Sequence, residues 1–292
     1  MRKGISFYYG FKNDPELRAK KIKEAGFDCV ITNADKRFNK QNGSIAKQMK
    51  LFKKYGLGVS SLHMTYTASE LPYFWQEGRL GEKLKKSLIR DVKIAHKYGF
   101  SCVVVHTAGE YSKIGEKRFL DVLKVCEKVK VPLALENLDS NRDLLVEIFK
   151  NIKSDYLKFC YDCGHNNVFD KKVDYLKVYS DKVVALHLHD NDGKKDLHTI
   201  SKVVSTVDWD KIADRLKGHK ELSLDLELLN RKENSFTADE YLQEAYKQVC
   251  DLEKKILEPK KSTSNTKKAK KSVSTKIQTK KVNSVKKTTK LK

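Results

Sequence analysis

The sequence alternates short runs of β-branched and aromatic residues with longer stretches of helical periodicity, and it does so eight times between Gly4 and Leu257. This alternation predicts parallel strands joined by crossover helices, because a parallel strand pair needs a long connection that returns the chain to the same end of the sheet. The expected strands are residues 4–10, 28–34, 58–64, 102–107, 132–137, 157–162, 183–190 and 222–228. Several of the intervening stretches end in a glycine, which is typical of a helix C-terminus.

Eight β/α units in about 250 residues predict an α/β fold of the (β/α)8 TIM-barrel type. An open doubly wound sheet is the alternative, but such sheets usually carry a glycine-rich phosphate loop after the first strand. The segment FYYGFKNDPEL (7–17) contains no GxGxxG, and the chain has no GxxxxGK[ST]. We therefore expect one barrel domain over residues 1–257.

The excess positive charge is concentrated beyond this domain. The formal net charge is +22, yet 13 of the 60 Lys and Arg residues follow Glu258, where no acidic or aromatic residue occurs. The remaining 47 basic residues stand against 38 acidic ones, a net charge of +9. Residues 258–292 are expected to form a disordered Lys-rich tail, since they cannot bury enough apolar surface to offset the entropy of ordering. Such a tail would bind polyanions, including nucleic acid, without sequence preference.

The sequence also bears on the compartment of the protein. No apolar run approaches the roughly 20 residues of a membrane-spanning helix, and the start MRKGISFYYGF lacks the apolar stretch of a secretory signal. The six cysteines do not have the spacing of a disulfide framework. We expect a cytoplasmic protein with reduced thiols and no membrane association. The CxxC formed by Cys160 and Cys163 overlaps an expected strand and has no second copy, which disfavours a redox or zinc-binding role.

Polar residues end four of the expected apolar strands. They are Glu136 in PLALEN, Asp162 in LKFCYD, His187 in VVALHLHD and Glu227 in LSLDLEL. The active site of a TIM barrel lies at the C-terminal ends of its strands, so these four side chains are expected to converge. Buried carboxylates without partners are costly, and a cation explains them best. Oxygen and imidazole ligands suit Mn²⁺, Mg²⁺, Co²⁺ or Zn²⁺.

The histidines follow the same pattern. Six of the eight lie at or just past an expected strand end: His63, His106, His165, His187, His189 and His198. A single histidine at such a position is more often a hydrogen-bonded structural residue than a ligand. The pattern of all six favours a site at the mouth of the barrel.

Several motifs together resemble the xylose isomerase-like TIM-barrel superfamily. They are HLHDNDGKKDLH (187–198), VDW (207–209), YDCGH (161–165) and ALEN (134–137). The superfamily includes sugar phosphate isomerases and epimerases as well as the endonuclease IV type of apurinic-site (AP) endonuclease. The resemblance covers nearly all of residues 1–257, and its most specific part is the HxHDNDG...DxH segment.

The resemblance implies roles for nine residues. Glu136, Asp162, His187 and Glu227 match the metal ligands of the sugar-converting members. His165 matches a residue near the substrate or an additional metal. The family positions that complete a three-zinc cluster in the nuclease branch are matched by His63, His106, Asp196 and His198. Because all nine are present, the set is compatible with both branches.

Proton transfer on a small sugar or sugar phosphate is the expected reaction. A proton leaves a carbon next to a carbonyl and returns elsewhere, a divalent ion stabilises the enediolate, and Glu136 and Glu227 act as the acid/base pair. The alternative is cleavage of DNA at abasic sites with up to three Zn²⁺ ions. A catalytically silent barrel that binds through its tail is disfavoured by the intact ligand set.

Three further features bear on specificity. Relatives commonly have a glycine-containing turn before the Asp-Trp pair, whereas this chain reads TISKVVST (199–206), so we expect a loop of different shape. The aromatic run 73–75 either covers the substrate or packs the loop on the barrel. Lys194 and Lys195 either bind a substrate phosphate or lie in a solvated loop, and the Lys-rich composition favours the loop.

Overall fold

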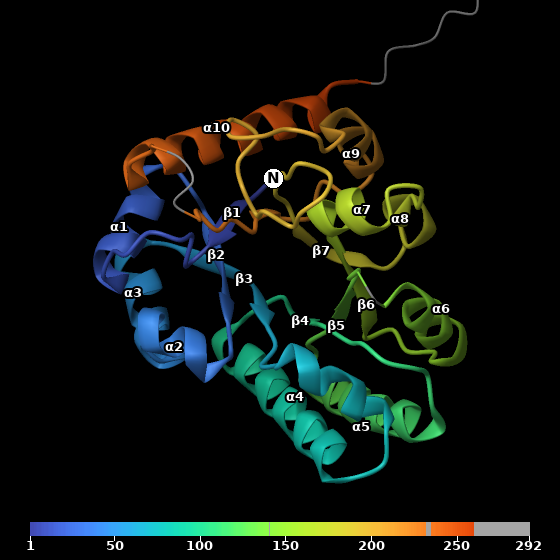
Figure 1. Ribbon diagram of the computed structural model, residues 1–292. Coiled ribbons are helices and arrows are strands. Elements are labelled where there is room, and N and C mark those ends of the chain that lie inside the picture. Colours follow the sequence, from blue (N-terminus) through green and yellow to red (C-terminus); the bar gives the residue numbers. More distant parts are fainter. Residues whose placement is uncertain (140, 232–234, 260–292) are drawn as a thin grey trace, which may run out of the picture. The chain divides into compact units, whose positions relative to one another are not determined.

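Eight parallel strands form one sheet that curls into a nearly closed barrel (Figure 1). They are β1 (Lys3–Ser6), β2 (Cys29–Asn33), β3 (Gly58–His63), β4 (Cys102–Val105), β5 (Leu133–Glu136), β6 (Leu157–Asp162), β7 (Val183–His187) and β8 (Leu224–Leu226). Each strand from β1 to β6 pairs with the next one in the chain, and β1 also pairs with β8. The seam between β7 and β8 is closed by a single parallel bridge between Leu188 and Leu226. The predicted TIM barrel is therefore confirmed.

The computed structural model describes residues 1–139, 141–231 and 235–259, and residues 1–258 form one compact unit. The Lys-rich tail expected to be disordered lies outside the described residues from position 260 onward. Within the described part of the chain, no helix is both long enough and apolar enough to cross a membrane.

Helices lie around the outside of the strands (Figure 1). They are α1 (Pro15–Glu24), α2 (Lys36–Asn42), α3 (Ile45–Tyr55), the 3-10 helix η1 (Ala68–Trp75), α4 (Arg79–Tyr98), α5 (Lys113–Val129), α6 (Arg142–Asn151), α7 (Cys163–Phe169), α8 (Tyr175–Val178), α9 (Trp209–Leu216) and α10 (Ala238–Leu257). The glycine signals are confirmed where α3 and α4 end, because Gly56 and Gly99 adopt φ values of 64° and 76° that favour glycine. The last helix begins with a capping box formed by Thr237 and Glu240.

The strands present different side chains to the two sides of the barrel wall. Large apolar residues such as Val103, Leu133 and Phe159 point outward and pack in the core shared with the helices. Small residues fill the interior as a separate buried cluster of Cys102, Val104, Ala134, Cys160 and Ala185. Successive side chains of a strand point to opposite sides, so the residues two positions beyond these small ones also point into the barrel.

Several strands end earlier than expected. The first ends at Ser6 instead of residue 10, and β7 ends at His187 instead of residue 190. The residues that follow lie outside the named strands at the mouth of the barrel, although Leu188 still forms the bridge to Leu226. The apolar pattern continues past the strand ends because these residues are themselves buried, as Phe7, Tyr9 and Leu188 show.

Candidate functional site

The strands aim the predicted site residues into the barrel. Glu136 lies two positions after the interior residue Ala134, and His187 lies two positions after Ala185. His106 follows Val104 in the same way. The two-residue period of the strand therefore explains why these polar side chains gather at one end of the interior.

The structure brings together the four residues that end the apolar strands. One ligand atom each from Glu136, Asp162, His187 and Glu227 lies within 4.8 Å of the others. His187 Nδ1 is 3.2 Å from Glu136 Oε2 and 3.1 Å from Glu227 Oε2. The Glu136 and Asp162 side chains are buried, whereas 24% of the Glu227 side chain is exposed.

Two buried atoms of this group make no hydrogen bond among the described residues. They are Glu136 Oε1 and His187 Nδ1. Each lies instead at ion-pair distance from other site residues, His187 Nδ1 from the two glutamates and Glu136 Oε1 at 3.3 Å from His165 Nδ1, and a bound cation would satisfy both atoms. The donor set of three carboxylates and one imidazole could hold a divalent ion such as Mn²⁺, Mg²⁺, Co²⁺ or Zn²⁺.

The charges around this group favour ionised carboxylates. Burial alone would raise the pKa of Glu136, but the His187 and His106 imidazoles outweigh it and hold that pKa well below its usual range. The pKa of Glu227 is likewise low, because His187 and His198 outweigh the effect of burial. The site is therefore built to keep acceptor oxygens charged.

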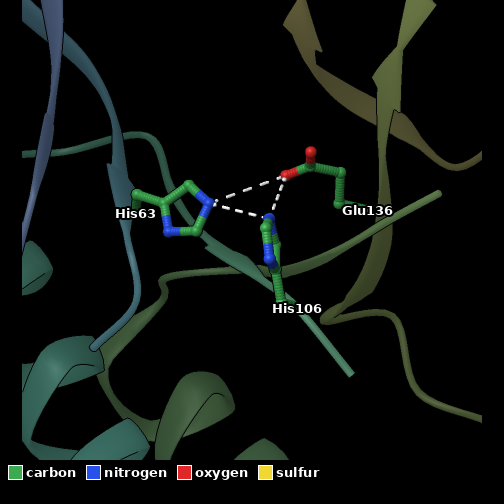
Figure 2. Close-up of side chains that lie close together, drawn as sticks. All are labelled: His63, His106 and Glu136. Carbon is green, nitrogen blue, oxygen red and sulfur yellow. Dashed lines mark hydrogen bonds and ion pairs between the residues drawn. The ribbon is translucent and has the colours of Figure 1, made fainter. Parts of the chain in front are cut away.

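A second cluster adjoins the first. His63 Nε2 lies 3.0 Å from His106 Nε2, and His106 Nε2 lies 3.1 Å from Glu136 Oε2. Figure 2 shows the two rings and the carboxylate pointing toward one another. Burial lowers the pKa of His106, so a neutral ring able to bind a cation is favoured. These three residues form a further group that could hold a metal ion.

A third cluster lies on the other side of Glu136. His198 Nε2 is 2.8 Å from Asp196 Oδ2, and His165 Nε2 is 3.5 Å from the same oxygen. His165 belongs to α7, and its Nδ1 lies 3.3 Å from Glu136 Oε1, so this residue connects the third cluster to the first. His165, Asp196 and His198 could also hold a metal ion.

These clusters line a cavity of about 530 Å³ at the C-terminal ends of the strands. Eight of the nine predicted site residues line it: His63, His106, Glu136, His165, His187, Asp196, His198 and Glu227. The ninth, Asp162, is buried behind the lining. Its Oδ1 accepts a hydrogen bond from the backbone N–H of His165 at 2.7 Å and thereby caps α7.

From the sequence, His189 has no individual role beyond its place among the six histidines near strand ends, and three further residues that line the cavity are not identified. His189 is fully buried, and its Nε2 lies 3.1 Å from Asp162 Oδ1, which orients that carboxylate. The sequence signal for this role is that His189 follows His187 by two positions, because side chains two positions apart in an extended chain point to the same side. Tyr8, Tyr66 and Arg231 also line the cavity, and nothing in their sequence context indicated it.

The structure decides two of the open alternatives. Phe74 and Trp75 are buried, and Trp75 stacks on Phe119 and donates a hydrogen bond from Nε1 to Thr107 Oγ1 at 2.9 Å, whereas Tyr73 is exposed. The end of η1 therefore packs on the fold through Phe74 and Trp75, and none of the three residues lines the cavity. Lys194 and Lys195 are exposed and lie outside the cavity lining, as expected for a solvated loop.

The CxxC cysteines are buried inside the fold. The Cys163 thiol donates to the carbonyl oxygen of His189 at 3.1 Å, and Cys160 packs among the interior residues of the barrel. Burial raises the pKa of both thiols far above the usual range, which keeps them protonated and unreactive.

A comparison with protein families gives a match over residues 19–249 to the family described as xylose isomerase-like TIM barrel. The chain belongs to the xylose isomerase-like TIM barrel family. An uncharacterised protein from Methanocaldococcus jannaschii is 27% identical over 213 residues, which cover 68% of this chain and 81% of that protein. An uncharacterised protein from Sinorhizobium fredii is 32% identical over 102 residues, and this match spans only 32% of its length and 33% of this chain.

Solved structures share the xylose isomerase-like fold. A D-tagatose 3-epimerase-like protein superposes with a TM-score of 0.69 at 18% identity, covering 88% of this chain and 97% of its own. The D-psicose 3-epimerase from Clostridium cellulolyticum also gives 0.69, at 15% identity, with coverage of 88% and 99%. The 3-keto-D-glucoside 4-epimerase from E. coli gives 0.63 at 18% identity, with coverage of 87% and 100%. At these identities the likeness concerns the fold.

Proposed function

We propose that this chain is a divalent-metal-dependent isomerase or epimerase that moves a proton on a small sugar or sugar phosphate. The observation that carries the proposal is the four-residue group with ligand atoms within 4.8 Å of one another, three of whose members line the 530 Å³ cavity. A cavity of roughly 300–1,000 Å³ is typical of small-molecule sites. The three solved structures named above are described as sugar epimerases or as epimerase-like, which supports the same substrate class.

The metal would be held by Glu136, Asp162, His187 and Glu227. When bound, a divalent ion supplies stabilisation of the negative charge that develops on the sugar oxygens as the proton leaves. His189 would hold the Asp162 carboxylate in orientation through its 3.1 Å contact.

Glu136 and Glu227 are the proposed acid/base pair. Both line the cavity, and they flank the same nitrogen of His187 at 3.2 and 3.1 Å. Their low pKa values keep both carboxylates ionised at neutral pH, so either can accept the proton from carbon. The carboxylic acid formed in this way returns its proton to the neighbouring carbon in an isomerisation. In an epimerisation the other glutamate, ionised at the start, first takes up a proton from water and then delivers it to the opposite face. Isomerisation and epimerisation share the first of these transfers.

The remaining walls of the cavity fit a sugar. Phe7, Leu71 and Phe169 line it together with Tyr66, and they offer apolar surface to the C–H faces of a sugar ring or chain. The imidazoles of the cavity adjoin these rings, since Tyr66 lies 4.4 Å from His106 and Phe169 lies 6.0 Å from His165 between ring centroids, and they would hydrogen-bond hydroxyl groups. Apolar surface beside imidazole donors and acceptors would orient a polyhydroxylated substrate over the carboxylates.

The second candidate function is cleavage of DNA at abasic sites. Two further groups favour it, because His63 and His106 share Glu136, and His165, Asp196 and His198 form a group of their own. Three metal ions held in this way would activate water and stabilise the leaving oxygen of a phosphodiester. The two functions therefore predict different numbers of bound ions.

The test is the metal content of the purified protein, measured by mass spectrometry, together with activity assays on ketohexoses and on a duplex with one abasic site. One bound ion and conversion of the ketohexose support the sugar reaction. Three zinc ions and strand cleavage support the nuclease. A protein that binds no ion after exposure to Mn²⁺ and Zn²⁺ contradicts both proposals.

A further inference from the structure

Asp190 is a fully buried carboxylate just beyond β7 that accepts six hydrogen bonds. Its Oδ1 accepts from the backbone N–H groups of Asn191, Thr206 and Val207 at 3.0, 2.9 and 3.1 Å. Its Oδ2 accepts from Ser201 Oγ, Ser205 Oγ and Trp209 Nε1 at 2.7, 3.0 and 2.8 Å. Five of the six donors belong to residues 201–209, so this one side chain gathers a segment 11 to 19 positions further along.

These contacts close the loop between β7 and α9. The backbone of Asp190 also pairs with Thr199 through hydrogen bonds of 2.8 and 3.1 Å, and Thr206 Oγ1 donates to the carbonyl oxygen of Asn191 at 2.7 Å. Asp196 and His198 lie between the two closed ends of the loop. Asp190 itself does not line the cavity. It therefore acts on the site only through the loop that it closes.

The conformation of His198 indicates that the loop is held under constraint. Its φ is +50°, a value that residues other than glycine rarely adopt. Such a conformation persists only where the surrounding structure over-determines it. The neighbouring Thr199 is paired to Asp190 on both of its backbone hydrogen-bonding groups. On the other side, the His198 carbonyl oxygen accepts from the backbone N–H of Leu229 at 2.8 Å and His198 Nδ1 lies 3.0 Å from the carbonyl oxygen of Glu227, so contacts on both sides supply the constraint.

The same contacts explain how the segment 199–206, which lacks glycine and proline, takes its shape. Residues 199–206 read TISKVVST, and the hydroxyl groups of Ser201, Ser205 and Thr206 all take part in the network around Asp190. Side-chain hydroxyls thus take the place of a glycine-containing turn. A buried carboxylate, instead of backbone freedom, therefore sets the shape of this segment.

We propose that Asp190 is a positioning residue that places Asp196 and His198 in the cavity by closing the loop 191–208 around its own carboxylate. The catalytic part of this inference rests on the proposed function, because Asp196 and His198 affect turnover only if the cavity is the active site. The structural part is independent of it. The experiment therefore needs one readout of turnover and two of loop position.

The test compares Asp190→Asn, Trp209→Phe and the double variant. An asparagine keeps one oxygen for the three backbone N–H groups, and its amide can donate to the serine hydroxyls, but the amide N–H then faces the indole N–H of Trp209. Removing that indole donor relieves the conflict. We expect Asp190→Asn to lower kcat/KM for the ketohexose about 100-fold and the double variant to recover at least tenfold of this loss. Additive losses in the double variant would overturn the proposal.

Two measurements follow the loop without using turnover. Hydrogen–deuterium exchange of residues 199–207 is expected to accelerate at least tenfold in Asp190→Asn and to slow again in the double variant, with α5 unchanged in both. The NMR cross-peak of the His198 ring, assigned with His198→Gln, is expected to move in Asp190→Asn and to return toward its wild-type position in the double variant. Exchange and a cross-peak that stay at wild-type values in Asp190→Asn would overturn the proposal.

The matched control is Asp192→Asn in the same loop. Asp192 Oδ1 accepts only from the backbone N–H groups of Lys194 and Lys195, and an amide oxygen can accept both. This variant is expected to match the wild-type protein in all three readouts, and a control that behaves like Asp190→Asn would overturn the proposal. If the wild-type protein converts no sugar, the proposed function fails, and exchange together with the His198 cross-peak still decides the role of Asp190.

Discussion

Replacing Glu136 by glutamine perturbs the proposed metal site with the least change in shape. Glutamine has the size of glutamate but lacks its charge. Glu136 Oε2 lies 3.1 Å from His106 and 3.2 Å from His187, and an amide can keep one hydrogen bond in this position. The substitution therefore removes a negative charge from the four-residue group while preserving packing around a fully buried side chain.

The loss of metal affinity can be estimated from the span of the group. Its ligand atoms lie within 4.8 Å of one another. Even at that full separation, a divalent cation and one carboxylate attract each other by about 7 kcal/mol at an effective dielectric constant of about 20. Dehydration of the ion offsets most of this attraction. With a net contribution of about 2.7 kcal/mol from this carboxylate to the binding free energy, Glu136→Gln weakens metal binding about 100-fold.

Thermal unfolding with and without Mn²⁺ measures this loss. A ligand at about 100 times its Kd stabilises the folded state by about 2.7 kcal/mol, which for a domain of this size raises Tm by about 5–11 °C. At the same Mn²⁺ concentration, a variant with 100-fold weaker binding gains only about 0.4 kcal/mol, or about 1–2 °C. Turnover of the ketohexose is expected to fall about 10²–10⁴-fold, the usual contribution of a general acid or base.

The matched control is Glu24→Gln on α1, where 61% of the glutamate side chain is exposed and its ion pair with Lys20 spans 3.7 Å. That variant should retain the full Mn²⁺-dependent rise in Tm and full turnover, because surface pairs of this kind contribute little. A Glu136→Gln protein with the wild-type rise in Tm and wild-type turnover would refute the assignment of Glu136 as a ligand and as a base.

Three further predictions concern the surroundings of the site. Burial lowers the pKa of His198, but its hydrogen bond with Asp196 outweighs burial and raises the pKa to about 9. The protonated His198 ring therefore adds on the order of 3 kcal/mol to the free energy of unfolding below pH 6.5, and this contribution is lost as pH rises through 9. Urea titrations of metal-free protein should show this loss in the wild type and not in His198→Gln. In Gly164→Ala the added Cβ would lie 1.8 Å from His189 Cε1, so we expect the free energy of unfolding to fall by about 1–3 kcal/mol. Calorimetry should also show weaker Mn²⁺ binding, and unchanged values of both would show that His189 is free to move. A thiol reagent should label the partly exposed Cys250 of the native protein first and the buried Cys160 only after unfolding, and early labelling of Cys160 would contradict its burial.

The strand pattern carried most of the information about the site. Glu136, Asp162 and His187 were predicted to converge because each closes an apolar strand, and in the structure each continues the interior phase of the small residues before it. Strand period and strand ends are local properties of the sequence. Their direction into the barrel follows from the parallel architecture that the eight-fold alternation predicted.

The loops were less predictable because long-range contacts decide them. The aromatic run 73–75 gave no local sign that Trp75 would bond to Thr107 while Tyr66 would line the cavity. The burial of Asp162 behind the lining, with His189 against it, likewise depends on how neighbouring strands are staggered in the barrel.

The sequence by itself determined the barrel, the end of it that holds the candidate site and eight of the residues that line the cavity. These depend on periodicities of two and of about 3.6 residues, which are set by neighbours in the chain. Only the tertiary structure decided which of these residues share an ion-sized space and how the loop that carries His198 is closed. A buried carboxylate such as Asp190 collects donors from 11 to 19 positions away, and a pattern of short period does not specify such contacts.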